Sequence, residues 1–197
     1  MQYKSIKEQN DEFISILKQN QDLMSILDYI YELQLPNFYI VADSVFQTIW
    51  NYYDGKPLNY QIKDIDIIYY DEDNLSQDSE KELEDKISNH FKELNINYEL
   101  DIHNEARVHL WKKVNENQDI NYYKNTEDTI DQFIATVHAI GITKKDNEIQ
   151  VYAPYGLSDI FKRTIRPIKH EKNTKALYEK MINSWNKRFK NLTIIEW

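Results

Sequence analysis

The sequence contains no cysteine, and only three glycines and four prolines among its 197 residues. The lack of cysteine excludes a disulfide scaffold, a thiol nucleophile and a thiolate-bound metal site. Low glycine and proline content argues against a disordered or collagen-like chain. No apolar run approaches the roughly 20 residues of a membrane-spanning helix. Because Met1–Asp11 is polar and lacks the apolar region of a secretory signal, we expect a cytoplasmic protein.

Apolar and aromatic residues are plentiful by contrast. Hydrophobic residues make up 41% of the chain and aromatic residues 13%, enough for one sizeable core. The chain is too short for two large domains. We therefore expect a single domain over residues 1–197. It would comprise an N-terminal helical segment (1–36), a core (37–160) and a basic C-terminal helical segment (161–197).

Charge is distributed unevenly along the chain. The formal net charge is −9, yet Ile160–Trp197 holds ten Lys and Arg against three Asp and Glu, a net +7. Residues 1–159 therefore carry −16. The basic segment is either a solvated helix or a wall that faces an anionic ligand. The acidic total argues against a protein that coats nucleic acid nonspecifically, because that requires a broad basic face.

Hydrophobic periodicity predicts helices that alternate with strands, which is typical of an α/β or α+β domain. Helices are expected over 13–17, 23–33, 44–53, 76–94, 126–139 (with Thr126 as N-cap), 156–163 and 174–189. Strands are expected over 38–41, 62–70 and 96–102, with a hairpin of 140–143 with 148–152. The segment 104–113 fits a strand or a helix, and a strand that continues past a kink is preferred.

Asp64 and Asp66 are the sharpest chemical feature. They lie in a strand rich in Ile and Tyr, and because side chains alternate, both point to one face while Ile65 and Ile67 point into the core. Two adjacent carboxylates repel each other, and a divalent cation is the simplest compensation. The alternative is an exposed edge strand with two solvated Asp residues.

A third carboxylate is available on the strand that follows. Glu99 and Asp101 alternate with apolar residues there, so one of them reaches the same metals if the two strands pair. Oxygen ligands favour Mg²⁺ or Mn²⁺ over Zn²⁺. Two such ions can activate a hydroxyl and stabilise a phosphoryl transition state.

A candidate phosphate turn lies upstream, where a strand ends at Val41 and a helix begins. Ala42, Asp43 and Ser44 form this turn. Backbone N–H groups at a helix N-terminus bind phosphate, and small residues allow its close approach.

Together these features resemble the nucleotidyltransferase superfamily of polymerase-β-like enzymes, and more closely a bacterial nucleotidyltransferase-like family. Further stretches carry the resemblance, which spans about residues 38–190: Thr48–Asn51, Lys63–Asp71, Asn104–His109 and Ala153–Phe161. It implies a mixed β-sheet flanked by helices. It also implies Asp64, Asp66 and Asp101 as catalytic metal ligands, with Glu99 in reserve, and Ser44 in the phosphate turn.

One residue departs from the superfamily pattern. Asp43 stands where that pattern has glycine, so it restricts the backbone, and its charge repels a triphosphate.

Several other side chains are candidate substrate contacts. Arg107 either clamps a phosphate or forms a structural ion pair, and His109 is a candidate base. The remaining candidates are Asn104, Lys162, Arg163 and Arg166. Trp50, Trp111 and Trp185 are expected in the core rather than as a base-stacking platform.

The resulting hypothesis is a Mg²⁺- or Mn²⁺-dependent transfer of a nucleoside monophosphate from an NTP to a hydroxyl acceptor, with release of pyrophosphate. A small molecule or a protein side chain fits the acidic balance better than RNA as the acceptor, and no membrane partner is expected. The alternative is a catalytically impaired member of the same fold that binds a nucleotide or a protein.

Overall fold

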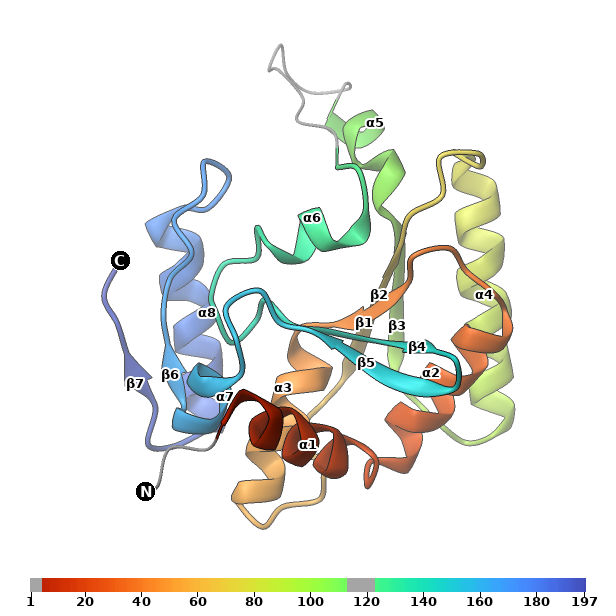
Figure 1. Ribbon diagram of the computed structural model, residues 1–197. Helices are drawn as coiled ribbons and strands as arrows, with labels where there is room; N and C mark the ends of the chain where they lie inside the picture. Colours follow the sequence, from red (N-terminus) through yellow and green to blue (C-terminus); the bar gives the residue numbers. More distant parts are fainter. Residues whose placement is uncertain (1–4, 113–122) are drawn as a thin grey trace.

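The centre of the molecule is a five-stranded sheet in the order β3-β2-β1-β4-β5 (Figure 1). A computed structural model describes residues 5–112 and 123–197. The strands of this sheet are β1 (Tyr39–Val41), β2 (Asp64–Tyr69), β3 (Glu99–Asn104), β4 (Gly141–Lys145) and β5 (Glu148–Tyr152). Strands β2 and β3 run parallel and the other neighbours antiparallel, so the sheet is mixed. The expected α/β fold is confirmed.

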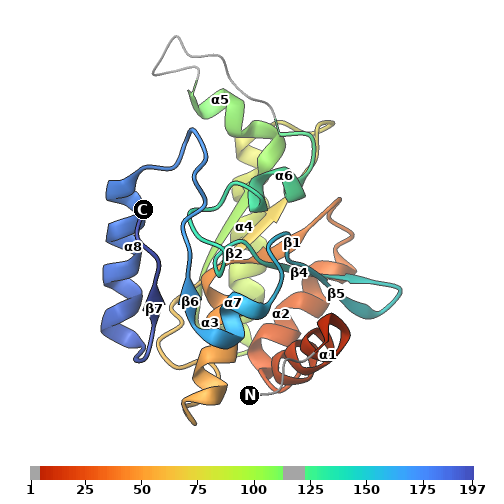
Figure 2. The same cartoon turned by 60° about the vertical axis from the view of Figure 1, so that its left-hand side comes forward.

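Helices flank this sheet. They are α1 (Ile6–Leu17), α2 (Gln21–Glu32), α3 (Asp43–Tyr53), α4 (Gln77–Glu93), α5 (Val108–Lys112), α6 (Thr126–Ile130), α7 (Ser158–Lys162) and α8 (Lys175–Arg188), with a 3-10 turn, η1, at Glu105–Arg107. A separate parallel pair, β6 (Thr164–Ile165) and β7 (Thr193–Ile194), lies alongside α8 (Figures 1 and 2). Within the described ranges, no helix is long and apolar enough to cross a membrane.

The two faces of the sheet differ in character. One face belongs to the main core, and its Ile residues on four neighbouring strands are at most 2% exposed: Ile40, Ile65, Ile67, Ile102 and Ile142. On the other face, Val41 and Ile68 pack in a smaller cluster with Ile130 and Ile168. Asp66 pairs with Val41, so it lies on this second face. The second face is therefore apolar over one part and acidic over another.

The segment after β3 does not continue as a strand, so the preferred kinked strand over 104–113 is wrong and the helical alternative holds for its described part. Strand β3 ends at Asn104, and η1 and α5 follow; Lys113 lies outside the described residues. The side-chain oxygen of Asn104 accepts hydrogen bonds from the N–H groups of Asp71 and Ala106. These two bonds turn the chain out of the sheet.

The helix predicted over 126–139 is shorter than expected and begins with a different cap. Helix α6 ends at Ile130, and Asn125, rather than Thr126, caps it by accepting from the Asp128 N–H. The hydroxyl of Thr126 donates instead to the Asn37 carbonyl at 2.7 Å. Downstream, Ala135 forms a bridge with Pro167, and Ile134, Ala135 and Val137 pack in the main core.

Candidate active site

The register of β2 and β3 brings four carboxylates together. Asp64 pairs with Glu99, and Asp66 pairs with Asp101. Paired residues of neighbouring strands share a face, so all four side chains project from the second face of the sheet. Strand β2 lies between β1 and β3, so the alternative of an exposed edge strand is wrong. The predicted pairing of the two acid-bearing strands is confirmed.

Asp66 experiences the strongest electrostatic effect in this cluster. Burial raises its pKa to about 7, and the nearby charges of Asp64, Asp101 and Asp43 contribute in the same direction. Like charges raise a carboxyl pKa because each disfavours ionisation of the other. A cation placed among these groups would reverse the effect.

Asp101 has a partner that the sequence interpretation overlooked. The Nε2 atom of His103 lies 2.8 Å from Asp101 Oδ1, and the Asp101 side chain remains half-exposed. The signal was present, because residues two apart on a strand share a face. His103 therefore belongs to the acidic cluster.

The turn before α3 carries its strained residue one position earlier than expected. Ala42 has φ +60° and ψ −127°, a conformation that favours glycine, whereas Asp43 is already helical. The Ser44 hydroxyl donates to the Val41 carbonyl at 3.3 Å. The backbone restriction predicted at Asp43 thus falls on Ala42, and only the charge of Asp43 departs from the expected phosphate turn.

The negative charge of Asp43 is compensated by side chains of the C-terminal segment. Asp43 accepts hydrogen bonds from the Trp185 indole at 3.1 Å and from Arg188 Nη2 at 3.2 Å. His138 Nε2 lies 3.7 Å away, and burial lowers the pKa of this histidine. Sequence reasoning missed these three partners, because no local pattern links residues so far apart along the chain.

A cavity of about 540 Å³ opens between α8 and the start of β2. Its lining includes Asp43, Lys63, Asp64, Ser184, Trp185 and Arg188. The cavity therefore joins the phosphate turn to the acidic cluster, with one Lys and one Arg available for anions. Lys63 lies within a motif that carries the resemblance, but it was not predicted as a site residue.

The fit of this site to a metal ion depends on donor chemistry. Clustered Asp carboxylates are the ligands that Mg²⁺ and Mn²⁺ prefer, and the pKa of Asp66 is raised first by burial and then by the neighbouring negative charges. As the side chains stand in the described part of the chain, no three acidic or His residues converge closely enough to hold one ion. The ligand set Asp64, Asp66 and Asp101 stays a prediction.

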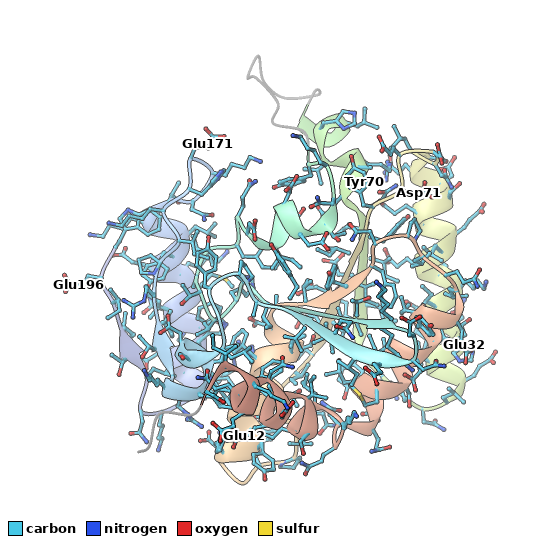
Figure 3. The ribbon with its side chains drawn as sticks, in the orientation of Figure 1. Glu12, Glu32, Tyr70, Asp71, Glu171 and Glu196 are labelled. Atoms are coloured by element: carbon cyan, nitrogen blue, oxygen red, sulfur yellow. The ribbon has the colours of Figure 1, made fainter. Side chains whose placement is uncertain are left out.

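Two of the predicted substrate contacts make structural interactions. Arg107 is 3% exposed, pairs with Glu80 and donates from Nε to the Leu75 carbonyl. Asn104 is fully buried, and its side-chain amide donates to the Asp71 carbonyl in the loop after β2 (Asp71 is labelled in Figure 3). The ion-pair alternative for Arg107 is the one that the structure contains.

The other candidate contacts are more scattered. Arg163 bonds to Asp54 and to the Trp50 carbonyl, while half-exposed Arg166 donates to Asp159. Lys162 is exposed, and His109 lies partly exposed in α5. The structure does not bring these four into the cavity beside Asp64.

The tryptophan expectation is largely met. Trp50 and Trp185 are fully buried in the main core. The side chain of Trp111 lies outside the described residues.

Comparisons with known proteins agree with this architecture. Residues 28–194 match the profile of a family described as Nucleotidyltransferase, and the chain belongs to that family. A solved structure described as a CCA-adding enzyme head domain is similar, with 25% identity and a TM-score of 0.78. The match covers 95% of this chain and 96% of the other. No curated protein matches the sequence. The resemblance inferred from the motifs is confirmed, and the family and fold support nucleotidyl transfer as the general function.

Proposed function

We propose that this protein transfers a nucleoside monophosphate from an NTP to a hydroxyl acceptor and releases pyrophosphate. The observation that carries the proposal is the parallel β2–β3 register, in which Asp66 lies beside Asp101 and Asp64 lies two residues away on the same face. The acceptor oxygen attacks the α-phosphorus, the bond from that phosphorus to the α–β bridging oxygen breaks, and pyrophosphate leaves with this oxygen. The proton of the acceptor hydroxyl is released to water.

Asp64, Asp66 and Asp101 would hold Mg²⁺ or Mn²⁺. A divalent cation there would lower the pKa of the acceptor hydroxyl and balance the negative charge of the phosphoryl group. The first N–H groups of α3, at Asp43 and Ser44, would bind phosphate oxygens in the turn. Lys63 offers a cation from the wall of the same cavity.

The acceptor is the least constrained part of the proposal. The net charge of −9 favours a small molecule or a protein side chain. Similarity to a CCA-adding enzyme head domain favours RNA instead. RNA therefore belongs in any acceptor panel beside the other two classes.

A second candidate function is nucleotide or protein binding without catalysis. Asp43 in the phosphate turn favours it, because a carboxylate there repels a triphosphate. The two candidates share the nucleotide site and differ in whether the acidic cluster binds metal and turns over NTP.

Isothermal titration of each NTP with Mg²⁺, followed by a pyrophosphate-release assay, tests the proposal. We expect wild-type protein to bind at least one NTP. A double variant, Asp64→Asn with Asp66→Asn, should lose Mn²⁺ binding and turnover while remaining folded, because removal of charge repulsion offsets the lost polar contacts.

Asp78→Asn with Asp85→Asn is the matched control. It removes the same charge from exposed positions of α4. Metal binding should survive in this control. Retained Mn²⁺ affinity in the Asp64/Asp66 variant would refute the site, and NTP binding by wild type without pyrophosphate release from any acceptor would favour the binding function.

A further inference from the structure

Arg188 lies beside the phosphate turn, and it is already paired with an anion. Its Nη2 donates to Asp43 at 3.2 Å and its Nη1 donates to the Gln47 side-chain oxygen at 2.9 Å. Asp43 and Gln47 lie one turn apart on α3. Arg188 therefore bonds α8 to the first turns of the helix whose N-terminus forms the phosphate turn.

Two donors in this cluster have no acceptor among the described residues. Arg188 Nε is buried without a partner, and so is Gln47 Nε2, although Gln47 is only 1% exposed. Buried polar groups are normally hydrogen-bonded, so such groups call for an explanation. Both belong to residues that also contact each other, and Arg188 is one of the residues that line the cavity.

The chemistry of these unpartnered donors is that of an anion site. A guanidinium has five N–H groups in a planar fork that matches phosphate oxygens. Lys63 adds a second positive charge to the cavity wall. Asp64, on the same wall, places the acidic cluster within reach of a metal-bound polyphosphate.

Asp43 retains other partners if Arg188 turns toward a ligand. The fully buried Trp185 donates its indole N–H to Asp43, and its ring contacts those of Phe46 and His138. The charge of Asp43 therefore stays partly compensated without the guanidinium.

We propose that Arg188 binds the triphosphate of the nucleotide, and that Asp43 holds Arg188 in place until phosphate oxygens replace it. This inference rests on the proposed function and deepens it, because it assigns a binding role to the basic C-terminal segment. Asp43 then pairs with Arg188 in the free protein and competes with the ligand for this cation. The negative charge of Asp43, which stands where the superfamily pattern has glycine, is thus compensated by Arg188 of helix α8.

The test uses inorganic tripolyphosphate with Mg²⁺, a probe with the triphosphate charge but no base or sugar. In Arg188→Gln we expect the Kd to rise by about tenfold or more, because a charge-assisted bond is lost. The control Lys187→Gln removes the same charge from an exposed neighbour on α8, and its Kd should change by less than about twofold. Asp43→Asn should bind more tightly than wild type, because the competing charge is gone.

Two further measurements separate a binding role from a structural one. Arg188→Lys keeps the charge but not the fork, and we expect a rise in Kd of about threefold even if Arg188→Gln fails to fold. In wild type, the probe should change the fluorescence of Trp185, and Trp185→Phe should lose that change.

An equal Kd in Arg188→Gln and Lys187→Gln, with both folded, would overturn the inference while the proposed function stands. An equal Kd in Arg188→Lys and wild type would do the same. Failure of wild type to bind both the probe and every NTP would overturn the proposed function together with this inference.

Discussion

Two arginine–carboxylate pairs lie toward opposite ends of the central sheet, and they differ in how completely they are satisfied. Arg107 pairs with Glu80 beyond the end of β3, and Arg188 pairs with Asp43 beyond the end of β1. The Arg107 and Glu80 side chains are 4% and 11% exposed, whereas those of Arg188 and Asp43 are 23% and 21% exposed.

Their surroundings differ in the same direction. Glu80 also accepts from the Asn104 N–H, and Arg107 also donates to a backbone carbonyl, so the first pair is enclosed in a bonded network. The second pair lines a cavity and keeps an unpartnered Nε. An enclosed pair stabilises the fold, whereas a pair beside a cavity can exchange its partner. The comparison therefore supports a structural role for Arg107 and is the basis of the ligand-binding role proposed for Arg188.

The largest expected effect is on stability at the enclosed pair. Arg107→Ala should lower the free energy of unfolding by about 3–5 kcal/mol, because it leaves the Glu80 charge buried and unpaired. Arg188→Ala should cost only about 1 kcal/mol, since water reaches Asp43 through the cavity. Urea unfolding followed by circular dichroism measures both. Equal losses in the two variants would break the comparison.

A smaller effect concerns Asp66, in the acidic cluster on the second face of the sheet. Its pKa is about 7 in the folded protein, above the ordinary value, so its contribution to stability is full in acid and is lost as pH rises through 7. Asp66→Asn, which has no charge, should therefore gain about 2–3 kcal/mol over wild type between pH 5 and pH 8 in EDTA. Thermal unfolding at the two pH values measures this gain, and a constant difference would argue against a repelled carboxylate.

The smallest effect concerns the backbone of the phosphate turn. Ala42→Gly should stabilise the protein by about 0.5–1 kcal/mol, because glycine adopts the positive φ without strain. Asp43→Gly should destabilise it instead, since Asp43 is helical and bonded to Trp185 and Arg188. Denaturant midpoints compare the two variants, and a gain from Asp43→Gly alone would reverse the assignment of the strained position.

Local patterns were sufficient for much of this structure. The helix expected over 76–94 is α4 with its Ser76 cap, and the expected hairpin is β4–β5, where Asp146 and Asn147 take positive φ. Strand alternation was enough to predict that Asp64 and Asp66 share a face. In each case the determining interactions lie within a few residues of one another.

Interactions between distant parts of the chain were not predictable in the same way. Asn104 turns the chain by bonding to the Asp71 N–H, which overrides the apolar pattern beyond it. Asp43 meets Trp185 and Arg188 only because α8 packs against α3, and no spacing in the sequence encodes that contact. The acidic motif could be predicted from the sequence, whereas the pairing of Arg188 with Asp43 could be identified only from the fold.

The most direct test of the central claim is anomalous diffraction from crystals soaked with Mn²⁺ and an NTP. We predict Mn²⁺ peaks between Asp64, Asp66 and Asp101, with the triphosphate extending into the cavity beside Lys63. Bound NTP without Mn²⁺ at these carboxylates, or Mn²⁺ bound only elsewhere, would contradict the account.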